Sequence, residues 1–163
     1  MRTVAFLAPL TAALALASAA AAQPSAVVVT VSPDFAKTAE ELGQRDVRQQ
    51  VEDLTRTVER TLTARHALDG ARVELIITDL KPNRPTMQQV GDTPGLDPIR
   101  SISIGGAAIE GSVTMANGEV QPVKFDYYSN TLAEVQGFTT WQDASTAYNR
   151  LARNLAEGRF VKR

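Results

Sequence analysis

Between Ile99 and Ser129, apolar residues occupy alternate positions in two runs separated by Asn117 and Gly118. The alternating positions are Ile102, Ile104, Val113 and Met115 in the first run, and Val123, Phe125 and Tyr127 in the second. A period of two is typical of strands with one buried and one wet face. Asn-Gly accepts the positive φ angles of a two-residue hairpin turn. The stretch therefore predicts a long antiparallel hairpin whose apolar face needs a cover.

Two helical patterns supply candidates for that cover. Apolar residues recur every three or four positions from Asp46 onward, after a shorter stripe (Phe35, Ala39, Leu42) that Gly43 interrupts. The main stripe comprises Val47, Val51, Leu54, Val58 and Leu62, and a later one comprises Trp141, Ala144, Tyr148, Leu151 and Leu155. Glu52 and Arg56 have the spacing of a helical ion pair. Thr140 and Asp143 have the spacing of a capping box at the start of the later helix.

Two further strands complete the predicted order. Ala26–Val31 is a short run rich in β-branched residues, and 72–80 alternates apolar with polar residues. Gly105-Gly106 predicts a bulge or a close backbone approach, and Pro122 predicts an edge strand. The order β-α-β-β-β-α predicts an α+β two-layer sandwich. It would have a largely antiparallel sheet of about four strands and two helices on one face.

Residues 1–22 have the pattern of a secretory signal peptide. Arg2 precedes an apolar run from Val4 to Ala17, and small residues lead to a cleavage site near Ala22-Gln23. Cleavage there leaves 163 − 22 = 141 residues, which predicts one domain over 23–163. The chain has no cysteine, so a lipoprotein anchor has no attachment point. We expect a periplasmic or secreted protein without a membrane span.

The charge balance argues against polyanionic partners in general. Removing Arg2 leaves 16 basic and 18 acidic residues, a net charge near −2. That balance gives no general attraction to nucleic acid. The absence of cysteine also excludes disulfides and thiol catalysis.

The segment 79–98 shows no periodicity and contains four prolines and two glycines. Long loops of this kind in compact domains are usually functional or disordered. One interpretation is a partner-binding loop that uses Asn83, Arg84 and Met87. The other is a surface loop, stiffened by proline, that covers a sheet edge.

Catalytic and metal-binding patterns are missing from the sequence. A single histidine, His66, and no cysteine leave zinc, copper and haem without their usual ligands, and we expect no cofactor. Nucleophilic and phosphate-binding motifs are also missing, so the sequence predicts no catalytic residue. The remaining enzymatic hypothesis is a cell-wall glycan hydrolase that uses two of four acids, namely Glu110, Glu119, Asp126 and Glu134.

Two aromatic residues are candidates for ligand stacking. Tyr128 is out of phase with the apolar positions of its strand, and Trp141 begins the last helical stripe. A small-ligand carrier would place a pocket between helices and sheet near Trp141. The alternative is that these rings pack in the core or protect an edge.

Three strings together resemble exported proteins of Proteobacteria that belong to domain-of-unknown-function families. They are Pro82–Met87, Ile104–Ala107 with Gly111, and Thr139–Trp141. The resemblance implies a periplasmic or envelope address and supplies no catalytic residues. The element order is also similar to that of outer-membrane accessory lipoproteins, although the anchoring cysteine is missing here. The leading hypothesis is therefore a non-enzymatic domain that binds an envelope protein or polymer.

Overall fold

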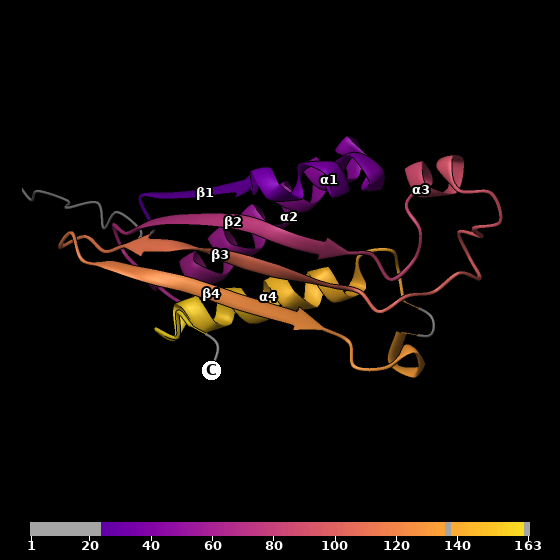
Figure 1. The fold of residues 1–163 in the computed structure, drawn as a ribbon. Coiled ribbons are helices and arrows are strands. Elements are labelled where there is room, and N and C mark those ends of the chain that lie inside the picture. The colour runs from indigo at the N-terminus through magenta and orange to yellow at the C-terminus, as the bar shows by residue number, and fades with distance from the viewer. Residues whose placement is uncertain (1–23, 136–137, 162–163) are drawn as a thin grey trace, which may run out of the picture.

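The computed structural model describes residues 24–135 and 138–161, so the predicted signal peptide and its cleavage site lie outside the described residues. Four strands form one sheet in the order β1-β2-β3-β4 (Figure 1). The strands are β1 (Ala26–Val31), β2 (Arg72–Lys81), β3 (Gly106–Thr114) and β4 (Val120–Tyr128). Strand β1 runs parallel to β2, and the other two pairs are antiparallel. The sheet is therefore mixed, with an antiparallel majority.

The helices confirm the predicted α+β class. The long helices α2 (Gln44–Ala64) and α4 (Gln142–Ala156) lie side by side on one face of the sheet (Figure 1). Four shorter segments are η1 (Pro33–Phe35), α1 (Ala36–Leu42), α3 (Met87–Asp92) and η2 (Leu132–Val135). On the other face of the sheet, Ile76, Glu110 and Lys124 are exposed. The layers are thus one sheet and one pair of helices.

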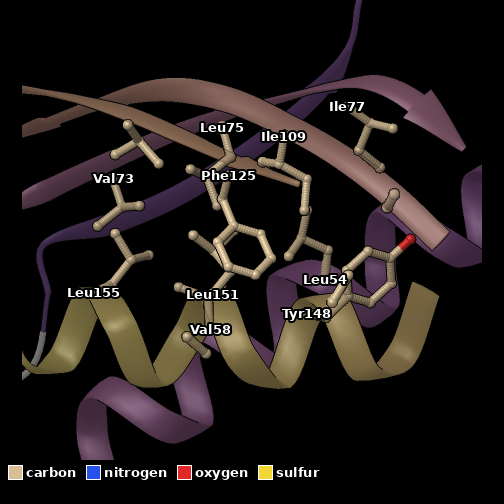
Figure 2. Packing of buried hydrophobic residues seen from close by; sticks show 14 of the residues in the cluster. Leu54, Val58, Val73, Leu75, Ile77, Ile109, Phe125, Tyr148, Leu151 and Leu155 are labelled. Carbon is tan, nitrogen blue, oxygen red and sulfur yellow. The ribbon is translucent and has the colours of Figure 1, made fainter. Parts of the chain in front are cut away.

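The core lies between those two layers. Leu54 and Val58 of α2 and Leu151 and Leu155 of α4 point toward the sheet, where Phe125 fills the space between them (Figure 2). The strands contribute Val73, Leu75, Ile77 and Ile109 to the same cluster. Burying a large aliphatic side chain stabilises a fold by about 1.5–3 kcal/mol. The apolar stripes that the sequence predicts for α2 and α4 thus face the sheet, and the buried residues of the strands face these helices.

The predicted hairpin is present but shorter than expected. Strand β3 begins at Gly106, so Ile102 and Ile104 precede it, and Ile104 is exposed. Ala107 and Ile109 occupy the buried positions at this end of the strand. The alternation continues through Ile102 and Ile104 in the sequence, but these residues belong to the preceding connection.

The hairpin turn is also different from the predicted two-residue turn. Beyond the last strand pair, Thr114 and Val120, Met115 N–H donates to Glu119 O at 2.7 Å, and Gly118 N–H donates to Met115 O at 2.9 Å. Gly118 has a φ of 85°, whereas Asn117 keeps a negative φ and accepts the Glu119 N–H with its side chain at 2.9 Å. This geometry is typical of a three-residue connection with glycine at the left-handed position.

Gly106, the first residue of β3, permits a close approach of backbones, as the sequence suggested. A Cβ on Gly106 would lie 2.1 Å from Tyr127 O, in the neighbouring strand. The bulge, however, is in β2, where the register shifts between Ile77 and Asp79.

The two edges of the sheet are different. Strand β4 is an edge strand, as Pro122 predicted, and the C-terminal segment covers part of it through the Lys124 N–H, which donates to Phe160 O at 3.0 Å. Strand β1 forms the other edge, and within the described residues no strand other than β2 pairs with it.

Candidate functional site

The connection from β2 to β3 extends beyond one end of the sheet (Figure 1), and we call residues 82–105 the excursion. Part of the segment predicted to be a loop, 79–98, is regular: β2 continues to Lys81, and α3 occupies Met87–Asp92. Helix α3 begins with a capping box, in which Thr86 Oγ1 accepts the Gln89 N–H at 3.2 Å and Gln89 Oε1 accepts the Thr86 N–H at 3.1 Å. The spacing Thr86-x-x-Gln89 is a signal for this helix in the sequence.

Asn83 fixes the base of the excursion. Its side chain is fully buried and joins α4 through two contacts with Asp143. Asn83 Nδ2 donates to Asp143 Oδ2 at 2.6 Å, and Asp143 N–H donates to Asn83 Oδ1 at 2.9 Å. Asp143 Oδ2 also accepts the Ser129 hydroxyl at 2.6 Å. A buried carboxylate needs such donors, so these contacts lock the excursion to the first turn of α4.

The same residue holds the end of the excursion. Asn83 N–H donates to Thr140 O at 2.8 Å, and Ser103 N–H donates to Asn83 O at 2.9 Å. Gly105 leaves room for the Asn83 side chain, because a Cβ on Gly105 would lie 2.6 Å from it. The expected capping box at Thr140 is wrong: the N-cap residue is Trp141, no side chain caps this end, and Asp143 points inward to Asn83.

Arg84 is half-buried and connects the excursion to the segment before α4. Its Nε donates to Phe138 O at 2.5 Å, and a terminal nitrogen donates to Ile99 O. Both acceptors are backbone carbonyls, so the guanidinium holds two distant segments at fixed positions. Asn83 and Arg84 were predicted to contact a partner, but their side chains are engaged within the chain.

Apolar side chains project from the excursion that these contacts hold. Met87 is 74% exposed and Ile99 is 77% exposed, the largest values among the exposed large apolar residues. The excursion also borders an open hollow of about 340 Å³, lined by Lys81, Pro82, Pro85, Gln89, Leu96 and Ser101–Ile104. Sequence reasoning identified Met87 but missed Ile99, which it assigned to the hairpin.

The two candidate stacking residues lie apart. Tyr128 is half-buried on the open face of the sheet, where its hydroxyl donates to Asp79 Oδ2 at 2.6 Å and Lys81 Nζ lies 5.2 Å from the ring centroid. Burial and this hydrogen bond to Asp79 raise the pKa of the Tyr128 phenol. Trp141 lies at the start of α4, and its Nε1 donates to Asp46 Oδ1 of α2 at 3.3 Å. The structure gives each ring a partner within the chain.

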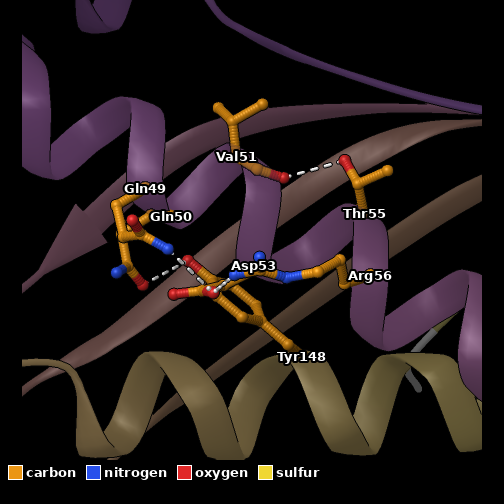
Figure 3. A network of polar contacts seen from close by, with 7 residues as sticks. All are labelled: Gln49, Gln50, Val51, Asp53, Thr55, Arg56 and Tyr148. Atoms are coloured by element: carbon orange, nitrogen blue, oxygen red, sulfur yellow. Dashed lines mark hydrogen bonds and ion pairs between the residues drawn. The ribbon is translucent and has the colours of Figure 1, made fainter.

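A polar network connects the two long helices (Figure 3). The buried Tyr148 hydroxyl of α4 donates to Gln50 Oε1 of α2 at 3.2 Å. Burial, and then the charge of Asp53, raise the pKa of the Tyr148 phenol. Arg56 pairs with Asp53 at 2.5 Å, in place of the expected pair with Glu52. The bond between Tyr148 and Gln50 joins α2 to α4, and the pair of Arg56 and Asp53 lies within α2.

The four acids considered for hydrolysis lie along the hairpin and just beyond it, and Asp126 lies on β4 two residues after Lys124. Glu110 forms an ion pair with Lys124 at 2.9 Å, and Glu119 accepts the Gln121 amide at 2.5 Å. Glu134 accepts the Asn130 N–H at 3.2 Å, beyond the opposite end of β4 from Glu119. Among the described residues, no group of three His, Cys, Asp or Glu side chains could hold a metal ion. In the described part of the chain, no helix is long and apolar enough to cross a membrane.

No protein-family model, curated protein or solved structure matches this chain. The candidate site is therefore defined by its geometry alone.

Proposed function

We propose that this chain is a non-enzymatic domain of the bacterial envelope that binds another envelope protein through the excursion. The proposed localisation in the envelope rests on the predicted signal peptide. The observation that carries the binding role is the exposure of Met87 and Ile99 on a segment held by buried contacts. Exposed apolar side chains on a fixed loop are a common feature of protein-binding surfaces.

The chemistry of the surface favours a protein partner over a polar polymer. Methionine adapts its shape to an apolar partner surface, and isoleucine gains free energy when it leaves water. The hollow beside Gln89 and Leu96 has room for an apolar side chain of the partner. In this proposal Met87 and Ile99 make contact with the partner, and Asn83 and Arg84 position the surface.

Site-specific photo-crosslinking tests the proposal. A photoreactive phenylalanine analogue replaces Met87 or Ile99 in the full chain, expressed in its native host, and the cells are irradiated. We expect one discrete covalent adduct from both positions, containing the same second protein by mass spectrometry.

Val120 is the matched control, because it is 58% exposed but lies at the far end of the hairpin. The analogue at Val120 should give no such adduct. Equal adducts from all three positions, or none from Met87 and Ile99, would overturn the proposal.

A further inference from the structure

The edge of β1 is a second surface that no described segment of the chain covers. The chain covers part of the β4 edge with its own C-terminal segment, through Lys124 and Phe160. The β1 edge has no such cover among the described residues. Its sequence, Ala-Val-Val-Val-Thr-Val, contains no charge and no proline. Charges and prolines are the usual protection of an edge strand against pairing with another chain.

The backbone of β1 has a defined set of outward groups. Ser32 N–H donates to Ile77 O of β2 at 2.9 Å. Because backbone groups alternate sides along a strand, Thr30 and Val28 also face β2. The N–H and C=O groups of Val27, Val29 and Val31 therefore point away from the sheet. Three residues at a spacing of two are available to pair with an added strand.

We infer that this edge pairs with a second copy of the chain, in a two-fold dimer whose β1 strands run antiparallel about an axis at Val29. In that register Val29 faces Val29 of the second copy, and Val27 faces Val31. All three outward residues then pair with outward residues. The two sheets join into one sheet of eight strands.

The helix beside the edge supports a second copy as the occupant. A groove of about 920 Å³ separates the start of β1 from α2, and four charged residues line it on the helix, namely Asp53, Arg56, Glu59 and Arg60. Two acids and two bases alternate along this side of α2. A two-fold axis reverses the helix direction, so the order of acid, base, acid and base along one copy faces base, acid, base and acid along the other. The stripe is thus complementary to itself, as an isologous interface requires.

A pair of double variants tests both the dimer and its register. Val28 and Thr30 lie on the open face of the sheet and are exposed, so charged side chains fit there without entering the core. In the proposed register Val28 of one copy faces Thr30 of the other. V28K/T30K places lysines opposite each other, whereas V28K/T30E places lysine opposite glutamate.

Molar mass is measured by light scattering on the secreted wild type and both variants over a concentration series. We expect dimers for the wild type and V28K/T30E, and half that mass for V28K/T30K. A wild type that is monomeric throughout, a dimeric V28K/T30K, or a monomeric V28K/T30E overturns the proposal. Circular dichroism checks that each variant is folded.

Amide hydrogen exchange of the wild type gives a test that needs no variant. The Val27, Val29 and Val31 amides should exchange more slowly as protein concentration rises, whereas the exposed turn at Asn117 should not change. Exchange at these three amides that is independent of concentration would contradict the dimer.

Discussion

At the scale of single residues, Asn83 connects three segments that are distant in the sequence. Its main chain bonds to Thr140 and Ser103, and its amide bonds to Asp143. A buried amide that satisfies a buried carboxylate is costly to remove, because the carboxylate loses a donor that water cannot replace. Asn83 is therefore a positioning residue for the surface that carries Met87.

A double-mutant cycle between Asn83 and Gly105 tests this placement. N83A should lower the free energy of unfolding by about 2–3 kcal/mol, since Asp143 keeps only the Ser129 donor. G105A should also destabilise the wild type, because its Cβ would lie 2.6 Å from the Asn83 side chain. In the N83A background that clash is gone, so we expect G105A to cost less by at least about 1 kcal/mol. Urea unfolding measures all four proteins.

Strict additivity of the two substitutions would contradict the contact between Asn83 and Gly105. N83Q serves as a control that keeps the amide chemistry but changes its reach, and it should not restore the stability of the wild type.

At the scale of elements, the local pattern of the sequence predicts most of the fold. Strand β1 has the predicted bounds, β2 is one residue longer, and Gly43 ends the first helical stripe as expected. These features depend on neighbouring residues, which the sequence shows directly. The start of β3 was wrong because Ile102 and Ile104 continue the alternation before Gly106. Their place is set by contacts such as Ser103 with Asn83, twenty residues away, which no local pattern shows.

The candidate site was harder to predict for the same reason. Polar residues in a proline-rich segment are usually exposed, so Asn83 and Arg84 were expected at the surface. Their acceptors, Asp143 and Phe138, lie more than fifty residues away. Met87 is exposed, as the binding hypothesis requires. A binding role for it stays a prediction.

Helix α2 offers a matched pair of substitutions at the same scale. Leu54 is fully buried under the sheet, whereas Val51 is half-buried. L54D places an unpaired charge in the core, at a cost of several kcal/mol against a typical total stability of about 5–15 kcal/mol. We expect L54D to be unfolded and V51D to fold with a lower melting temperature, as followed by circular dichroism. A cooperative melt of L54D near that of the wild type would contradict the assignment of this core face.

At the scale of the whole molecule, two surfaces that no described segment covers lie in different places. The excursion extends beyond one end of the sheet, and β1 forms one of its long edges (Figure 1). Residues of the β2–β3 connection make up the first surface, and β1 with α2 makes up the second. A dimer through β1 would carry two copies of the excursion. A partner with repeated binding sites would then bind the dimer with a higher apparent affinity than it binds one copy.

The central claim is that Met87 and Ile99 form the contact surface and that Asn83 holds this surface in place. Its most direct test is to measure the dissociation constant of the complex with the partner that crosslinking identifies. Truncation of central apolar contacts typically costs more than about 1 kcal/mol per residue. M87S/I99S should therefore weaken binding at least about tenfold, and N83A should weaken it although Asn83 is not exposed. V120S, which removes an equally apolar exposed side chain elsewhere, should bind as the wild type does. Unchanged affinity of M87S/I99S, or an equal loss in V120S, would contradict the account.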